Sequence, residues 1–336
     1  MRFIRRLTFQ ELVVFSPFRG MSRTSPAHFR LHVLRTRAAE AMDLLKTVFF
    51  LIRLPFALVW LTMADRPLLA YFRRNLDILF SLMKPPNRRT QLNVYYQYCA
   101  SRKYQREKMT ADPPKTVEDV FLSRDDPNPS RACLVENRIL EMDSPSYFMY
   151  RYSKIFPILK DLLTPGMRVC EFGCGQGPNL FFLKSKYPEA RYFGFDFDPE
   201  GIELGRFLSR RFGMDIRFDL LNLVHPGARP ECDMIYTSCA MEQLKYDTEQ
   251  VLRYFHSLKP KWVVHIEPVA ELYSRTDLGR DFFSRRYIAQ RDYQDRLYTV
   301  LKSMQSGRLL KLRDARRLGM SGNPLNEISL IVWQPF

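Results

Sequence analysis

The chain has 336 residues, of which 46% are hydrophobic and 14% are aromatic, so it can form a substantial core and a disordered chain is excluded. Its 6 cysteines form neither a C-x-x-C pair nor a zinc-type spacing, and we expect reduced thiols rather than a disulfide framework. Residues 1–110 hold 20 Lys and Arg against 6 Asp and Glu, a net charge of +14 out of the total of +16. A basic segment joined to a nearly neutral one predicts attachment to an anionic partner, either a membrane surface or a nucleic acid.

Two apolar stretches lie in the N-terminal segment. Residues 47–63 are apolar on all sides of a helix, but Arg53 and Pro55 near their middle favour a shallow or interfacial helix over a membrane-spanning one. Residues 67–83 repeat apolar side chains at helical spacing, which predicts an amphipathic helix. The sequence therefore predicts that residues 1–90 form a basic, apolar helical region that anchors a cytoplasmic protein peripherally at an anionic membrane surface.

Two alternatives remain for that region. Its apolar faces could instead cap a catalytic domain, and the Arg-rich composition of residues 1–40 is also typical of a transit peptide. Residues 91–144 predict a linker with a helical extension. Within it, the aromatic and basic side chains of residues 94–108 could contact nucleic acid, but such a mixture is more often a solvated helix.

From residue 145 the pattern becomes regular. Helices are predicted at 146–163, 178–187, 199–212 and 246–257, and strands at 167–172, 191–196, 216–221, 232–238 and 261–267. This alternation predicts an α/β domain over residues 145–336, with a doubly wound, Rossmann-like sheet of parallel strands. The last apolar runs, 309–314 and 327–334, have no helical pattern between them and predict a terminal antiparallel pair.

The stretch "VCEFGCGQG", residues 169–177, places three alternating glycines directly after a predicted strand. Neither the G-x-G-x-x-G pattern of dinucleotide-binding folds nor the G-K-[ST] of a phosphate-binding loop is present. Glu171, at the tip of the strand, puts a negative charge beside the ligand. That charge suits an ammonium or sulfonium group and opposes a pyrophosphate.

The stretch "VCEFGCGQG", followed by "YFGFDFDPEGIELG", resembles the class I S-adenosylmethionine-dependent methyltransferases. The resemblance implies a loop that cradles the methionine part of S-adenosyl-L-methionine, formed here by Glu171, Gly173, Gly175 and Gly177. It also implies that Asp196, which ends the second strand, accepts hydrogen bonds from the ribose hydroxyls.

The same resemblance implies a polar side chain against the adenine, which in "IRFDLLNL" is Asn222. It adds Phe197 and Ser238 to the cofactor-binding residues. Asp198 competes with Asp196 for the ribose but fits better as the cap of the helix that begins near Pro199.

The stretch "CDMIYTSCAMEQL", residues 232–244, resembles the family's fourth-strand motif, with Met-Glu-Gln in place of Leu-Glu-His. Because Cys239 and Gln243 depart from the metal ligands that some members use, we expect no catalytic metal. Glu242 either takes part in catalysis or is an acid that the helix dipole favours at a helix start.

Methyl transfer from a sulfonium requires alignment of the reacting groups, and a hydroxyl nucleophile also needs a base. In "KWVVHIEPVAELY", His265 and Glu267 are two residues apart and share one face of a strand. We expect Glu267 to accept a proton or to bind the acceptor, and His265 to assist it or to be a hydrogen-bonded core residue. The residues that follow, up to 309, either form the acceptor pocket, as the resemblance implies, or an ordinary charged helix pair.

Together these features predict a methyltransferase that uses S-adenosyl-L-methionine to O-methylate a hydroxylated small-molecule, glycan or lipid-linked acceptor at a membrane surface. One alternative is an RNA or protein methyltransferase that binds through its basic N-terminus. The family's Asn/Asp-Pro-Pro-Tyr/Phe signature for N-methylation is absent where "TSCAMEQ" stands, so nucleic acid is the less favoured partner. A second alternative is a non-catalytic scaffold that binds the cofactor.

Overall fold

The structure, a computed structural model, describes residue 64 and residues 66–85, 91–122 and 130–336, with the backbone alone for residues 91–98. All of these belong to one compact unit. The Arg-rich residues 1–40 and the apolar run at 47–63 lie outside the described residues. Within the described ranges, no helix combines the length and the apolar character needed to cross a bilayer.

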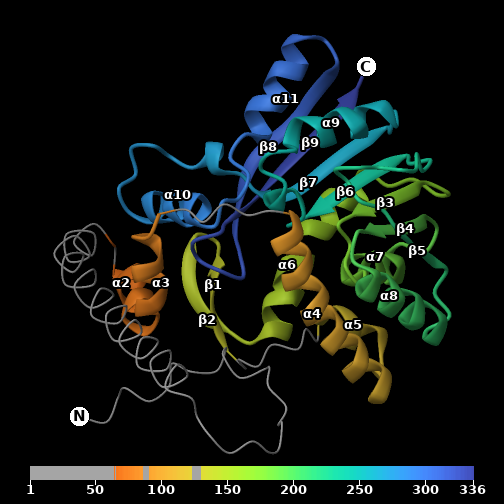
Figure 1. The fold of residues 1–336 in the computed structure, drawn as a ribbon, viewed down its shortest axis with the longest axis horizontal. Coiled ribbons are helices and arrows are strands. Elements are labelled where there is room, and N and C mark those ends of the chain that lie inside the picture. The colour runs from red at the N-terminus through yellow and green to blue at the C-terminus, as the bar shows by residue number, and fades with distance from the viewer. Residues whose placement is uncertain (1–63, 65, 86–90, 123–129) are drawn as a thin grey trace, which may run out of the picture. The chain divides into compact units, whose positions relative to one another are not determined.

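A seven-stranded sheet organises the chain, with the strand order β5-β4-β3-β6-β7-β9-β8 (Figure 1). The parallel strands are β3 (Arg168–Phe172), β4 (Arg191–Asp196), β5 (Ile216–Leu220), β6 (Met234–Ser238) and β7 (Trp262–Pro268). Two antiparallel strands complete the sheet, β8 (Leu310–Met320) and β9 (Ile328–Pro335). The predicted doubly wound sheet with a terminal antiparallel pair is therefore confirmed.

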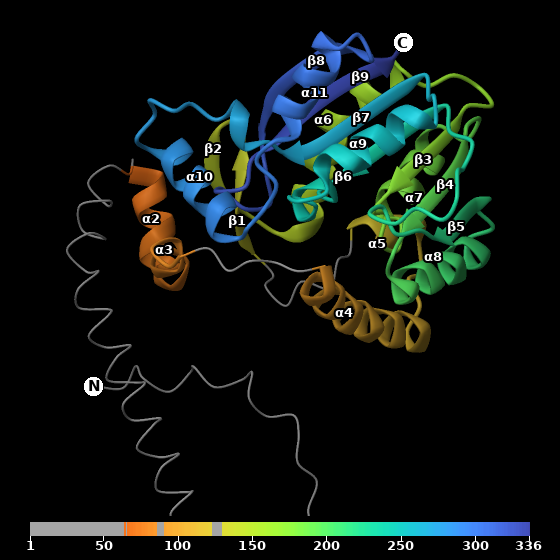
Figure 2. The ribbon, with the colours of Figure 1, turned by 45° about the horizontal axis from the view of Figure 1, so that its top comes forward.

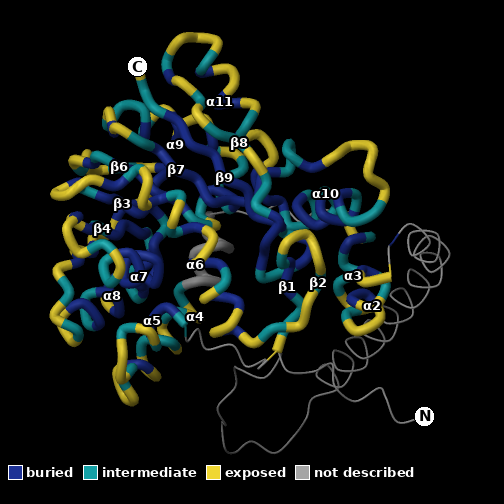
Figure 3. Tube along the Cα trace, turned by 180° about the vertical axis from the view of Figure 1, so that it is seen from behind, coloured by how far each residue is buried: buried dark blue, intermediate teal, exposed yellow. Residues whose placement is uncertain are grey.

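Helices cover both faces of this sheet because alternate strand residues point to opposite sides. Val169 packs in one core with residues of α6 (Ser144–Lys160), α7 (Pro178–Lys186) and α8 (Pro199–Arg211). Cys170, the next residue, packs in a second core with residues of α9 (Thr248–Ser257) and α11 (Leu297–Ser306). The central strands β3, β6, β7 and β9 are consequently buried along most of their length (Figure 3).

The segment before this domain is more structured than the sequence predicts. It contains α4 (Gln91–Ala111), α5 (Val117–Leu122) and a hairpin of β1 (Arg131–Val135) and β2 (Arg138–Met142). The hairpin turn consists of Glu136 and Asn137, at φ of 49° and 65°, without the glycine that usually marks such a turn. Tertiary contacts hold it instead, because Asn137 N donates to Gly319 O and Arg280 donates to Asn137 O.

The amphipathic helix predicted at 67–83 is two helices, α2 (Arg66–Arg74) and α3 (Leu76–Leu82). The break lies at Asn75, whose Nδ2 donates to Tyr71 O at 2.9 Å and so competes with the helical hydrogen bonds.

Helices α2 and α3 lie beside α10 (Arg280–Gln290) in Figures 1 and 2, and their apolar side chains pack in one core with those of α10. The ring centroids of Phe72 and Phe283 are 4.8 Å apart, and Arg286 Nη2 donates to Leu82 O at 2.8 Å. Leu68, Phe72 and Leu82 are fully buried. For these two helices the contacts favour the cap over the membrane anchor, because the face that would enter a bilayer is already covered.

We expect Phe72→Ala to lower the free energy of unfolding by about 3–5 kcal/mol, since a buried ring is replaced by a cavity. Leu76→Ala is the control, because Leu76 lies on the same helix pair but is 49% exposed, and it should change stability little. Denaturant unfolding measures both. Equal, small effects would mean that α2 and α3 do not dock on α10 in solution.

Candidate cofactor and active site

The predicted site residues gather at one edge of the sheet, because the carboxyl ends of parallel strands all lie at the same edge. Glu171 lies in β3, and the glycine loop connects β3 to α7. Asp196 ends β4 and Phe197 follows it, Asn222 follows β5, and Ser238 ends β6. Glu242 lies in a 3₁₀ turn after β6, and Glu267 lies near the end of β7.

The glycine loop needs its glycines for two separate reasons. Gly173, Gly175 and Gly177 have φ of 75°, 57° and 83°, a region that other residues rarely adopt. A Cβ atom at Gly173 would lie 2.3 Å from Ala240 Cβ, and one at Gly177 would lie 2.5 Å from Phe218 Cε1. The sequence indicates close approach by a ligand, but at these two positions the close approach is by the protein's own side chains.

Asp196 ties the loop to β4. Its Oδ2 accepts from Gly175 N at 2.7 Å, and its Oδ1 accepts from Asp198 N at 3.0 Å. Burial raises the pKa of Asp196, and these two backbone donors partly oppose that rise. Asp198 caps α8 by accepting from Glu200 N at 3.1 Å, which confirms its predicted role.

A chain of buried polar side chains crosses the site from Glu171 to Ser238. Asn179 Nδ2 donates to Glu171 Oε1 at 2.5 Å, Arg151 Nη1 donates to Asn179 Oδ1 at 3.1 Å, and Arg151 Nη2 donates to Ser238 Oγ at 2.5 Å. Arg151 is only 5% exposed, and no carboxylate among the described residues pairs with it. Although burial opposes its charge, nearby groups led by Tyr236 raise the pKa of Arg151 overall, so it stays protonated.

Arg151 is not among the residues that the sequence motifs predict, although its position in the sequence is informative. It lies on α6 at helical spacing from the buried residues Tyr147, Phe148 and Ile155, so a charge falls within an otherwise apolar face. A buried cation without a carboxylate partner among the described residues, beside the glycine loop, is the kind of group that function explains better than stability does.

His265 lies in the core beneath the edge. Trp333 Nε1 donates to His265 Nε2 at 3.0 Å, so the proton is on Nδ1, which lies 2.8 Å from Thr237 Oγ1. Burial lowers the pKa of His265 to about 3. These contacts favour the hydrogen-bonded core residue over the catalytic alternative, because both ring nitrogens already have partners.

Glu267 is also fully buried, but only one of its two carboxyl oxygens accepts a hydrogen bond from the described residues. Its Oε1 accepts from Ala240 N at 3.0 Å, and its Oε2 has no hydrogen-bond partner in the part of the chain that the structure describes. Burial, followed by the neighbouring Glu242, raises the pKa of Glu267 to about 8. Glu242 in turn accepts from Gln243 Nε2 at 2.9 Å and from Asn326 Nδ2 at 3.1 Å.

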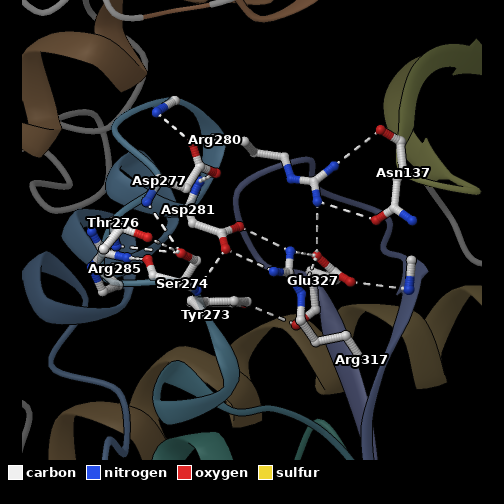
Figure 4. A network of polar contacts seen from close by, with 12 residues as sticks. Asn137, Tyr273, Ser274, Thr276, Asp277, Arg280, Asp281, Arg285, Arg317 and Glu327 are labelled. Atoms are coloured by element: carbon white, nitrogen blue, oxygen red, sulfur yellow. Dashed lines mark hydrogen bonds and ion pairs between the residues drawn. The ribbon is translucent and has the colours of Figure 1, made fainter.

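A buried ionic network attaches the segment after β7 to the terminal strand pair (Figure 4). Arg317 of β8 binds Asp281 of α10 through two hydrogen bonds, of 2.7 and 2.9 Å, and also contacts Glu327. Arg280 reaches Glu327 at 3.2 Å. Asp281 and Glu327 are 2% and 0% exposed, so α10 is anchored by buried charges and is not an ordinary solvated helix.

Among the described residues, no group of His, Cys, Asp and Glu is arranged to hold a metal ion. The expectation that catalysis uses no metal stays a prediction.

Comparisons with known proteins find a family match for part of the chain. Residues 163–301 match a family model described as a methyltransferase domain. No curated protein sequence matches the chain. One similar solved structure is magnesium protoporphyrin IX methyltransferase from Synechocystis PCC 6803, with 11% identity, a TM-score of 0.49, and coverage of 74% of this chain and 100% of its own.

Two further solved structures are similar. The PH0226 protein from Pyrococcus horikoshii OT3 has 12% identity and a TM-score of 0.42, and the match covers 57% of this chain and 96% of that one. Geranyl diphosphate C-methyltransferase from Streptomyces coelicolor A3(2) has 10% identity and a TM-score of 0.43, with 56% and 80% covered. The family match shows a methyltransferase domain over residues 163–301, and the strand order and the glycine loop support one of the class I S-adenosylmethionine-dependent kind.

Proposed function

We propose that this methyltransferase holds its cofactor across the carboxyl ends of β3, β4 and β6 and methylates a hydroxyl oxygen of a small-molecule, glycan or lipid-linked acceptor. The observation that carries the cofactor placement is Arg151, a buried guanidinium with no carboxylate partner among the described residues. The methionine end of the cofactor carries one carboxylate and one ammonium group. The former fits Arg151, and the latter fits Glu171, whose carboxylate is 1% exposed at the start of the same chain of hydrogen bonds.

The other end of the cofactor fits the edge of β4 and β5. Each oxygen of Asp196 accepts one backbone N–H, and a carboxylate oxygen can accept a second hydrogen bond from a ribose hydroxyl. Asn222 is exposed, and its Oδ1 accepts from Val224 N at 2.9 Å, which orients the amide at the end of β5 for the adenine. Phe197 and Ser238 complete the proposed cofactor residues.

When bound, the cofactor supplies a methyl group activated by its sulfonium. The chain's contribution is to fix the acceptor hydroxyl in line with that methyl group and to take up its proton. We propose Glu267 as the group that takes the proton, since a pKa of about 8 is close to the working range of a general base. Glu242, 7% exposed and held by Asn326, is proposed to position the acceptor or to tune Glu267.

The proposal of a membrane location rests on a shorter part of the chain than residues 1–90. Helices α2 and α3 use their apolar face to pack on α10. What supports a membrane surface is therefore the composition of residues 1–63, with the apolar run at 47–63 and many arginines.

The acceptor class can be tested with labelled cofactor. Purified full-length protein is incubated with S-adenosyl-L-methionine labelled in its methyl group and with fractionated cell extract. We expect label in the lipid, glycan or small-molecule fraction, in a form that resists the treatments that release label from RNA and protein. Label confined to RNA or protein would contradict the proposed acceptor and favour the alternative in which the basic N-terminus binds a macromolecule.

We expect Asp196→Ala to weaken the binding of S-adenosylhomocysteine by about 1.5–3 kcal/mol, which is the contribution of hydrogen bonds to a charged group. Titration calorimetry measures this loss. Asp219→Ala is the control, because Asp219 lies on β5 and, within the described ranges, pairs with the half-exposed Arg206 alone. Unchanged affinity in the Asp196 variant, with an unchanged melting temperature, would remove Asp196 from the ribose site.

Glu267→Gln should lower turnover by roughly 10²–10⁴-fold while cofactor affinity stays near that of the wild type. Wild-type activity should rise as pH increases through about 8, because the base must be ionised, and the variant should lack this rise. Glu249→Gln is the control, since Glu249 is exposed and pairs with Arg253.

The pH dependence of folding stability provides an independent test of the raised pKa of Glu267. Between the ordinary Glu pKa of 4.5 and the folded value of about 8, the folded state binds one proton more than the unfolded state. Stability therefore falls as pH rises across this window in the wild type, and Glu267→Gln should remove that part of the dependence. Full activity in the variant would exclude Glu267 as the base.

A further inference from the structure

Helix α4, which lies outside the residues matched by the methyltransferase family model, packs along α8 at the edge of the proposed cofactor site (Figure 2). Two side-chain contacts fix it there. Cys99 Sγ donates to Asp198 Oδ1 at 3.2 Å, and Arg106 forms an ion pair of 2.6 Å with Glu200. Both partners lie in the first turn of α8 or cap it, so α4 is held against the start of that helix.

These contacts bring Arg102 over the glycine loop. Its Nη1 and Nη2 lie 2.4 and 2.5 Å from the position that a Cβ atom would take at Gly175. Of the three alternating glycines, Gly175 is the one that faces a charged group where a side chain would be. Gly173 and Gly177 face Ala240 and Phe218 instead.

The guanidinium of Arg102 is not committed to the protein. Arg102 is half-buried, and no hydrogen bond or ion pair joins its guanidinium to the residues that the structure describes. It is close enough to Asp196 for its charge to counter part of the rise in pKa that burial causes there. A half-buried guanidinium beside a carboxylate and a glycine loop is placed to donate to a ligand that the carboxylate also binds.

We infer that Arg102 is a cofactor-contacting residue that donates to the ribose oxygens of S-adenosyl-L-methionine. A ribose hydroxyl has one proton to donate and lone pairs with which to accept. In the inferred complex, the Asp196 carboxylate accepts the hydrogen bond that the ribose hydroxyl donates, and the Arg102 guanidinium donates a hydrogen bond to the lone pairs of the hydroxyl oxygen. The inference rests on the proposed cofactor placement, and it extends the site to a helix that begins 72 residues before the family match, at Gln91 against residue 163.

The test uses the full-length protein and S-adenosylhomocysteine, because this ligand lacks the sulfonium charge that Arg102 would repel. Arg102→Ala should weaken its binding by roughly ten- to a hundredfold in titration calorimetry, the loss of one hydrogen bond from a charged donor. Arg102→Lys, which keeps the charge but loses the planar fork, should show a smaller loss. Lys103→Ala is the control, because Lys103 is the neighbouring exposed cation on the same helix, and it should bind as the wild type does.

A deoxyribose analogue locates the contact. In the wild type, the 2′- or 3′-deoxy form of S-adenosylhomocysteine should bind more weakly than the parent compound, and in Arg102→Ala this penalty should shrink for at least one of the two forms. Wild-type affinity in Arg102→Ala, or tighter binding, would overturn the inference and make Arg102 a bystander or an obstruction. So would equal deoxy penalties in both proteins. Failure of the wild type to bind S-adenosylhomocysteine at all would contradict the proposed cofactor placement itself.

Discussion

The hydrogen bond from Gly175 N to Asp196 Oδ2, 2.7 Å long, holds the glycine loop at the end of β4, and the arrangement of the site depends on it. Because β3 and β4 are parallel neighbours, the loop that leaves β3 can reach the carboxylate that ends β4. Gly173 N strengthens the same junction by donating to Phe195 O at 2.7 Å. The loop is therefore shaped by the protein before any ligand arrives, which reduces the ordering that binding would require.

The charges at this edge are balanced only in part. Glu171, Asp196 and Arg151 are all at least nine-tenths buried, and Arg151 reaches Glu171 only through the amide of Asn179. A buried guanidinium without a carboxylate partner among the described residues lowers stability, and the carboxylate of a zwitterionic ligand end would pair with Arg151. The network of Arg317, Asp281 and Glu327 differs because its charges pair directly, and we regard it as the attachment of α10.

Sequence patterns predicted the sheet well because apolar runs separated by helical segments leave few topologies open. The β1–β2 hairpin was not predicted, since its turn depends on contacts from Gly319 and Arg280, far along the chain. The sequence does not decide between a cap and a membrane anchor for α2 and α3 for a similar reason, because an apolar helix face does not reveal whether protein or lipid covers it. Motif positions predict Asp196 and Glu171 as members of the proposed site, whereas Arg151 and Arg102 lie beside it on helices that carry no motif.

In the proposed complex, the methionine end of the cofactor lies between Glu171 and Arg151, and its ribose lies on Asp196. A crystal structure of the full-length protein with S-adenosylhomocysteine tests this most directly. We predict that the ligand carboxylate lies within hydrogen-bonding distance of the Arg151 guanidinium and that the ribose hydroxyls lie within the same distance of Asp196. A ligand bound away from this edge, or bound here with Asp196 and Arg151 out of contact, would contradict the account.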